Sequence, residues 1–505
     1  MEFEPYGSKE SFGVLRYTDY MNNDTANNQI KLPKRLHVIG ICGVATSALA
    51  IAFHKRGVIV TGSDKGFFPP VSTELEQQGI SFYAGWHPEQ MFGGNDYEDS
   101  IIIVGTASGT TNPEIIFAKE KGIPCYSYPE VIGKYFAKEY SIVCAGTWGK
   151  TSSTALLSFI LEYASLSPTY MFGGISLSHD SAAKLTDSKW SVFEGDEYKS
   201  SPTDKGAKFF HYKTTNLLLT AVSWDHADLY PTEQEYFNAF RKLVAELPDD
   251  GSIVACTDGA EVKSIIKDFK GKIIPYGRQL PLDQVDSQYF AYKNLSQSKA
   301  GLKFTISKAN IDYIINSPIL GLYQAENITG CFAMAVNMGI DPKIVVEAIS
   351  KFKGLKRRME KRYEGQITII DDIAHSPEKA RSVINTLRSV YSGKVIVIFE
   401  PNTGGRSRES ISKYDNAFNE ADTVIVPRLT KLKVAENADE QPMDGAELCA
   451  TISKTHKNTI YLDDDSELIN YIKSTAQKDD VIAFLGSHGF RGMIEETIKI
   501  ISDLQ

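Results

Sequence analysis

The sequence predicts three consecutive α/β domains, and three observations carry this prediction. The chain has 505 residues, more than one hydrophobic core usually organises. Short apolar runs alternate with helical stretches in three separate parts of the chain, which is typical of parallel sheets covered by helices. The middle part also holds Gly149-Lys150-Thr151 between an apolar run and a helical stretch. We therefore predict a Rossmann-like domain at each end and a P-loop ATPase-type domain between them.

The first α/β domain is expected over residues 34–138, after a polar, loosely ordered leader over residues 1–33. Its strands are predicted at 36–41, 58–64 and 101–108, with a helix over 43–57.

The central domain is expected over residues 139–355. Its predicted strand segments are 141–147, 190–197, 217–228 and 252–258. Residues 280–318 alternate apolar and polar side chains and predict a small antiparallel appendage. The C-terminal domain is expected over residues 356–505, with strands at 367–374, 394–401, 422–427 and 480–486.

Composition narrows the class of partner and the compartment. Net charge is −9, with no basic face in view, which argues against a nucleic-acid partner. No apolar run reaches the roughly 18 residues of a membrane span, and the first residues lack the apolar core of a signal peptide. The six cysteines are scattered and form no metal-like spacing, which indicates reduced thiols. We expect a cytoplasmic protein without a membrane partner.

The run from Gly146 to Thr151 is a shortened P-loop, because Cys144 stands where the full pattern has its first glycine. In such a loop, backbone N–H groups wrap phosphate oxygens, Lys150 would reach the β- and γ-phosphates, and Thr151 would bind Mg²⁺. The predicted ATP-binding loop also includes Thr147, Trp148, Gly149 and Ser152. The competing interpretation, a ligand-free turn between strand and helix, is disfavoured by this context.

A second glycine turn, Gly40 to Gly43, follows the first strand, and Ser63 and Asp64 end the next. The dinucleotide fingerprint G-x-G-x-x-G is absent, which argues against a nicotinamide dehydrogenase. A nucleotide-diphosphate site and a plain tight turn both fit these residues.

Two acidic segments follow strands of the central domain: Glu194-Gly-Asp-Glu197 and Asp225-His226-Ala-Asp228. Mg²⁺ takes few protein ligands and prefers oxygen, so Glu194 and His226 near the P-loop are candidate metal ligands together with Thr151. Helix capping is the alternative role for such acids.

In the last domain, Asp372 and His375 follow one strand, and Arg406 and Arg408 follow another. Parallel sheets bind ligands at the carboxyl ends of their strands, so a ligand site and a solvated loop are both open here.

Taken in order, these segments resemble the Mur ligase family, the ATP-dependent amide-forming enzymes of peptidoglycan assembly. The matching stretches, all present in this chain, are AGTWGKT, TTNPEI with Asn112, EGDE, DHAD, GLYQAEN with Asn327, GLKRRME with Arg357 and Arg358, and DDIAHSP. GSDKGFFPPVSTELEQQGI, FEPNTGG and GSHGFRGM are similar to the UDP-N-acetylmuramate branch, which adds L-alanine or re-attaches a recycled tripeptide.

The resemblance implies substrates, a cofactor and roles. The substrates would be UDP-N-acetylmuramate, ATP and an L-amino acid or short peptide, with Mg²⁺ as cofactor and a monomer or homodimer as assembly. Lys150, His226, His375 and Arg406 would be catalytic. The nucleotide would be held by the P-loop residues, Asn327, Arg357, Arg358 and Asp372. The UDP-sugar would be held by Gly40, Gly43, Ser63, Asp64 and Asn112.

Some residues depart from the family pattern and keep rival functions open. Trp148 replaces the usual loop histidine, and Ser376 replaces the second histidine of a His-His pair. A non-catalytic or altered-specificity UDP-sugar-binding homologue and a P-loop small-molecule kinase are therefore the alternatives.

Overall fold

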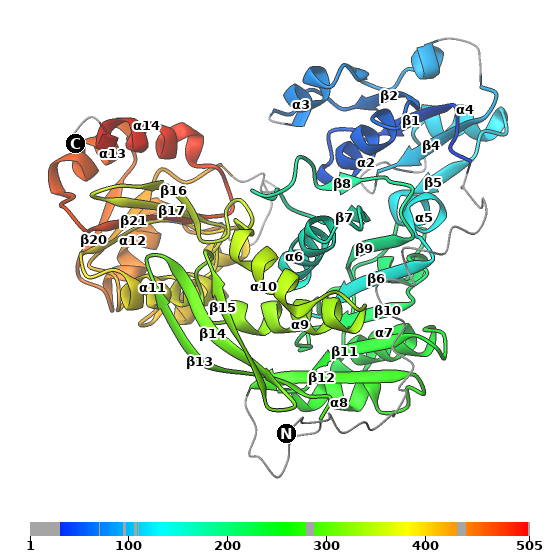
Figure 1. Ribbon diagram of the computed structural model, residues 1–505. Helices are drawn as coiled ribbons and strands as arrows, with labels where there is room; N and C mark the ends of the chain where they lie inside the picture. The colour runs from blue at the N-terminus through cyan, green and yellow to red at the C-terminus, as the bar shows by residue number, and fades with distance from the viewer. Residues whose placement is uncertain are drawn as a thin grey trace, which may run out of the picture.

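The computed structural model describes residues 31–502, except 70, 94–96, 106–108, 110, 202, 279–286 and 432–440. Nearly all of the leader predicted over residues 1–33 lies outside the described residues. Three sheets follow one another along the chain in an open arc, with the first and third at its two ends and the second between them (Figure 1). The predicted fold class is confirmed, while the domain limits stay predictions.

The first sheet has five parallel strands in the order β3-β2-β1-β4-β5. The order reverses between β1 and β4, which is where an open parallel sheet leaves a crevice at its carboxyl edge. The strands are β1 (Arg35–Ile39), β2 (Ile59–Asp64), β3 (Ser81–Ala84), β4 (Ser100–Val104) and β5 (Cys125–Ser127), and the main helices are α2 (Val44–His54), α3 (Val71–Gln77), α4 (Pro113–Glu120) and α5 (Tyr128–Val131).

The central sheet has ten strands in the order β15-β14-β13-β12-β11-β10-β6-β9-β7-β8. Its strands are β6 (Tyr140–Ala145), β7 (Thr169–Met171), β8 (Ala183–Lys184), β9 (Trp190–Gly195), β10 (Asn216–Leu219), β11 (Ser252–Cys256), β12 (Lys272–Arg278), β13 (Phe290–Ser298), β14 (Gly301–Lys308) and β15 (Ile311–Ser317). The predicted antiparallel appendage is β13 to β15, but β13 pairs in parallel with β12, so it extends the central sheet.

Helices cover both faces of this sheet. On one face pack α6 (Lys150–Tyr163), α9 (Gln324–Asn337) and α10 (Pro342–Lys351). On the other pack α7 (Glu233–Ala245) and α8 (Ala260–Ile266), and the same apolar cluster continues into the first domain. Ile142 and Val143 are consecutive residues of β6, and their side chains enter the apolar clusters on opposite faces of the sheet. This is expected for a strand that is buried on both sides.

The third sheet has the order β16-β17-β21-β18-β19-β20, and only the edge strand β16 is antiparallel. Its elements are β16 (Glu360–Glu364), β17 (Thr368–Asp372), α11 (Pro377–Val390), β18 (Val395–Glu400), β19 (Thr423–Pro427), α12 (Gly445–Ser453), β20 (Thr459–Leu462), α13 (Asp465–Thr475), β21 (Val481–Gly486) and α14 (Met493–Ser502). Ser376 is the N-cap of α11, which explains a serine there, because its hydroxyl accepts from an amide of the first turn.

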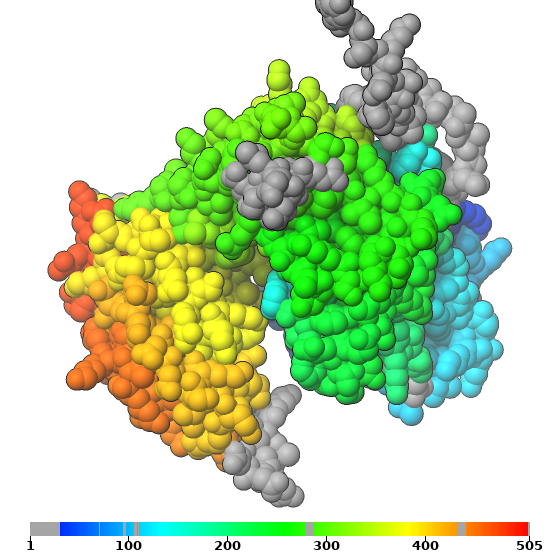
Figure 2. All heavy atoms as spheres, turned by 90° about the horizontal axis from the view of Figure 1, so that it is seen from below, coloured from blue at the N-terminus to red at the C-terminus, as the bar shows by residue number. Residues whose placement is uncertain are grey.

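The segment linking the second and third sheets is pinned to the loop after β7. Leu177 N donates to Gly354 O over 3.0 Å, and Lys356 N donates to Ile175 O over 2.8 Å. Seen from below, the surface is hollowed between the central domain and the third, so this linker bridges two bodies (Figure 2).

Two further features concern the cysteines and the length of the helices. All six cysteines are free. Among the helices in the described part of the chain, none combines the length and apolarity that a membrane crossing needs.

Candidate functional site

The loop between β6 and α6 has a conformation that requires glycine at two positions. Gly146 has φ +136° and Gly149 has φ +84°. A Cβ at Gly149 would lie 2.1 Å from Asn327 Oδ1, so the bare backbone lets α9 approach the loop. Asn327, predicted from a segment far along the sequence, therefore lies directly against the P-loop.

Lys150, the first residue of α6, is folded back into the loop. Its Nζ donates to Gly146 O over 2.7 Å and lies 2.9 Å from Glu197 Oε2. Thr147 is held by its side chain, which donates to Ser223 O over 2.7 Å and meets Tyr236 OH at 2.9 Å. Groups from the segment after β9, from α7 and from the segment after β10 thus contact the loop.

The predicted metal residues are only partly brought together. Thr151 Oγ1 donates to Glu194 Oε1 over 2.6 Å, and Gly173 N donates to Glu194 Oε2 over 2.6 Å. Thr151 and Glu194 are oxygen donors at the start of α6, which suits Mg²⁺ beside bound phosphate. His226 instead turns its Nε2 to Glu197 Oε1, 3.5 Å away, and its hydrogen bond to Glu197 raises the pKa of the imidazole.

The three-residue metal set therefore stays a prediction, of which Thr151 and Glu194 lie in direct contact while His226 is paired with Glu197. In the described part of the chain, three acid, thiol or imidazole ligand atoms lie within 4.8 Å of one another only at Cys256, Asp258 and Glu326. Glu197, to which the sequence motifs assigned no role, contacts both Lys150 and His226. The only sequence signal for it was its place as the third acid of the EGDE run.

A small cavity next to the loop gathers the remaining nucleotide candidates, Ser152, Asn327 and Arg358. Gln324, which was not predicted, also lines it and accepts from Asn327 Nδ2 over 3.0 Å.

Arg357 points elsewhere. Its guanidinium donates to Ser487 O over 3.2 Å and to His488 O over 2.9 Å, and it pairs with Asp371. Of the two predicted arginines, only Arg358 lines the cavity.

Asp372 ties the linker to the end of β17. It accepts from Met359 N over 2.7 Å and from Ala374 N over 2.8 Å. Burial raises the pKa of its carboxyl to about 6, while the nearby Arg358 acts in the opposite direction. Asp372 thus lies next to the arginine of the cavity and holds the backbone that carries it.

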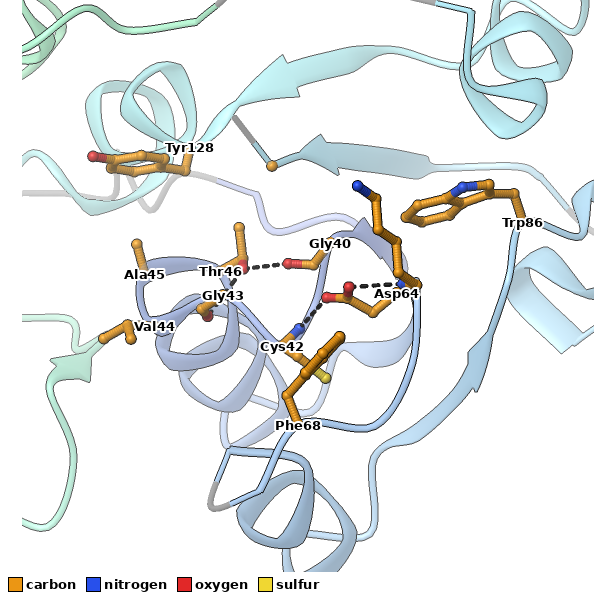
Figure 3. Close-up of a pocket in the computed structure, with 12 residues that line it drawn as sticks. Gly40, Cys42, Gly43, Val44, Ala45, Thr46, Asp64, Phe68, Trp86 and Tyr128 are labelled. Carbon is orange, nitrogen blue, oxygen red and sulfur yellow. Dashed lines mark hydrogen bonds between the residues drawn. The ribbon is translucent and has the colours of Figure 1, made fainter. Parts of the chain in front are cut away.

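The first domain has its own cavity of about 330 Å³ at the carboxyl edge of the sheet. Gly40, Gly43 and Asp64 line it, as predicted, and Asp64 Oδ2 accepts from Cys42 N over 2.8 Å (Figure 3). Phe68, Trp86 and Tyr128 also line it and were not predicted, because they come from three different segments. The cavity combines a helix N-terminus with aromatic walls.

Ser63 and Asn112 do not line this cavity, and their contact with a UDP-sugar stays a prediction. Ser63 is fully buried and its hydroxyl donates to Glu114 Oε2 over 2.5 Å. Asn112 is the N-cap of α4 and accepts from Glu114 N over 2.9 Å. Successive residues of a strand face opposite ways, so Asp64 reaches the cavity while Ser63 faces the interior.

Near the carboxyl edge of the third sheet, the predicted residues bond to backbone carbonyls or to a neighbouring carboxylate. His375 Nδ1 bonds to Ile373 O at 2.7 Å, and burial followed by the nearby Lys379 lowers the pKa of its ring. Arg406 is 8% exposed and donates to Met443 O over 2.8 Å and to Thr430 O over 2.9 Å. Arg408 is exposed and pairs with Glu447 at 3.0 Å.

Comparison with known proteins covers most of the chain. The Mur ligase family catalytic domain matches residues 35–140, the Mur ligase middle domain matches 144–335, and the Mur ligase glutamate ligase domain matches 357–488. The UDP-N-acetylmuramate–L-alanine ligase of Caldicellulosiruptor saccharolyticus is 29% identical over 476 residues, covering 93% of this chain and 98% of that protein.

Two solved structures share the fold. One is the UDP-N-acetylmuramate-alanine ligase MurC of Thermotoga maritima, with a TM-score of 0.74, 21% identity, and coverage of 93% of this chain and 100% of that one. The other is a murein peptide ligase of Psychrobacter arcticus, with a TM-score of 0.63, 24% identity, and coverage of 93% and 99%. With three consecutive family domains matched in order, the chain belongs to the Mur ligase family and is an ATP-dependent ligase.

Proposed function

We propose that the protein joins L-alanine, or a peptide that begins with L-alanine, to the lactyl carboxylate of UDP-N-acetylmuramate. The observation that supports this most is the P-loop, where Lys150 donates to Gly146 O and Asn327 lies next to Gly149. The same chain has a cavity beside the glycine turn of the first domain. The named relatives support the choice of sugar nucleotide. The reaction would take place in the cytoplasm, where ATP and such precursors are available.

The chemistry has two steps. The substrate carboxylate attacks the γ-phosphorus of ATP, so a carboxyl–phosphorus bond forms and the bond to ADP breaks. The amine nitrogen then attacks the carbonyl carbon, the bond to phosphate breaks, and the amine loses its proton to a base. An acyl phosphate is needed because oxide is a poor leaving group from a carboxylate.

The protein would contribute mainly position and charge. In a P-loop, backbone amides wrap the phosphate, and Lys150, which here donates to Gly146 O, would turn its ammonium to that phosphate. Mg²⁺ held with Thr151 and Glu194 would neutralise phosphate charge. Asn327, Gln324 and Arg358 would hold the adenosine part.

In the first domain, the N-terminus of α2 would face the diphosphate, since helix N-termini attract anions. Trp86 or Phe68 offers an aromatic face for the base. The third domain would bring the amine, with His375 and Arg408 as its candidate contacts. A monomer or homodimer stays a prediction.

Inorganic phosphate release tests the proposal. Purified protein would receive Mg-ATP and UDP-N-acetylmuramate, and then L-alanine, L-serine, glycine or the L-alanine-started tripeptide in turn. We expect phosphate only with one class of amine, together with a product of the matching mass. ADP without phosphate would instead identify a small-molecule kinase.

A second candidate is a UDP-sugar-binding homologue with altered specificity or without turnover. Trp148, which is 60% exposed in place of the family's loop histidine, is the observation that favours it. UDP-sugar binding by calorimetry without phosphate release with any amine would support this alternative.

A further inference from the structure

Lys208 lies where the first domain meets the central domain. Its side chain is only 12% exposed, and its Nζ donates to the carboxylate of Asp196. The same Nζ lies 5.4 Å from the ring centre of Tyr128, which lines the cavity of the first domain (Figure 3). One cation therefore contacts a residue of the cavity wall and a carboxylate of the central domain.

The backbone fixes Lys208 in this position. After β9 the chain makes a loop and returns, so that Lys208 N donates to Tyr198 O over 3.1 Å and Phe209 N donates to Asp196 O over 3.3 Å. The ring centre of Tyr198 lies 5.8 Å from the ammonium. Two aromatic rings and one carboxylate thus surround the charge.

The same segment leads from the cavity wall to the P-loop. Asp196 comes two residues after Glu194, whose Oε1 accepts from Thr151 Oγ1 over 2.6 Å at the start of α6. The contacts therefore run without a break from Tyr128 through Lys208 to the helix that follows the phosphate loop.

The proposed substrate would have to span the same path. Its uridine diphosphate would occupy the first-domain cavity, while its lactyl carboxylate has to meet the γ-phosphate at the P-loop. A carboxylate that leaves water for a partly enclosed position needs a cation beside it. In the described part of the chain, Asp196 is the only carboxylate paired with Lys208, and an ammonium has three donors. Lys208 can therefore bind a second carboxylate without losing the first.

We propose that Lys208 binds the lactyl carboxylate and thereby selects UDP-N-acetylmuramate over UDP-N-acetylglucosamine. The two nucleotides share uridine, diphosphate and the N-acetyl group, and they differ by the lactyl ether that carries the carboxylate. This inference rests on the proposed function and adds to it a residue that determines the choice of sugar. The ammonium would orient the carboxylate toward the P-loop and would take no part in making or breaking bonds.

Calorimetry with each sugar nucleotide, without ATP or amine, tests the proposal. Lys208→Met keeps a long apolar side chain and removes the ammonium. We expect it to weaken the binding of UDP-N-acetylmuramate by roughly ten- to hundredfold, because a charged hydrogen bond is lost, and to change the Kd of UDP-N-acetylglucosamine by less than about threefold.

Two further variants separate this contact from general damage. Lys208→Arg retains a cation and should keep most of the preference for the muramate. Lys205→Met changes an exposed lysine three residues earlier and should alter neither Kd. Thermal melts check folding, and an unchanged Kd for ADP shows that the P-loop is intact.

Equal weakening of both sugar nucleotides in Lys208→Met would overturn the inference, because it would mean a contact with the diphosphate or a distorted cavity. Unchanged binding of UDP-N-acetylmuramate would overturn it as well. In both cases the unaltered protein would still bind the muramate and release phosphate, so the proposed function would stand. If the unaltered protein bound neither sugar nucleotide, the proposed function would fail together with this inference.

Discussion

In the central domain, the residues of the P-loop are held by side chains from distant elements, whereas at the carboxyl edge of the third sheet the predicted residues hold their own loops. Lys150 reaches Glu197, two residues after the end of β9, and Gly149 is close to Asn327 on α9. Arg406 instead donates to two backbone carbonyls, and Arg408 pairs with Glu447 at the surface.

The two regions therefore differ in how their candidate residues are held. The nucleotide loop has the glycine conformations of a P-loop, and the ammonium of Lys150 lies within it. In the third domain, His375, Arg406 and Arg408 are each bonded to groups of the same domain. We infer that amine binding depends on how this domain closes over the central one, a step common in enzymes that protect a reactive intermediate from water.

The largest expected effect comes from removing the P-loop cation. Lys150→Ala should lower the rate of phosphate release by at least roughly 10²–10³-fold, because phosphate charge loses its main protein partner. Lys184→Ala, an exposed lysine paired with Glu162, should leave the rate unchanged. Full activity in Lys150→Ala would remove the P-loop from the proposed mechanism.

The same contrast explains what the sequence could predict. The P-loop is encoded by adjacent residues with fixed backbone conformations, so its position between β6 and α6 could be read locally. Glu197 could not be assigned, because its role depends on Lys150, His226 and Tyr236, which come together only in the fold. Likewise, Trp86 and Tyr128 reach the first-domain cavity from separate segments.

Ser63 and Arg357 show a second limit. Each directly precedes a residue that lines a cavity, Asp64 or Arg358. The side chains of Ser63 and Arg357 nevertheless bond to other partners. A motif identifies a short segment, while the direction of each side chain depends on the strand face and on local backbone. Arg357, with φ +57°, has a backbone conformation that sequence patterns do not predict for arginine.

Acid should weaken the contact between the loop after β7 and the segment that links the second and third sheets. His179 lies in that loop and is the group that takes up the proton. Burial lowers the pKa of this imidazole to about 4, from 6.5. The unfolded chain then binds the proton first, so the stabilisation is present above pH 6.5 and is lost as the pH falls towards 4. The loss should approach about 3 kcal/mol in urea unfolding.

His179→Gln should flatten this pH dependence, since glutamine can still bond with Ser176 Oγ but does not titrate. His54→Gln, at the end of α2, serves as the control. An equally steep loss of stability between pH 6.5 and 4 in His179→Gln would show that another group is responsible.

At the third sheet, Arg406→Ala and Arg408→Ala form a matched pair. Arg406→Ala should reduce the free energy of unfolding by about 2–4 kcal/mol, because two buried hydrogen bonds from a charged group are lost. Arg408→Ala should change it by less than about 0.5 kcal/mol, as expected for an exposed ion pair. A rise in the amine KM of Arg408→Ala at unchanged stability would identify Arg408 as the contact to substrate carboxylate.

The smallest effect is expected at Trp148. The loop around it is held by Thr147, by the hydrogen bond from Thr220 to Trp148 O and by the contact of Gly149 with Asn327, none of which needs the indole ring. Trp148→His should therefore change the Kd for ADP by less than about threefold, measured by calorimetry, and Trp148→Phe should behave alike. If Trp148→His instead alters which amine supports phosphate release, the ring contacts the acceptor side of the site, and the family's histidine position sets substrate choice.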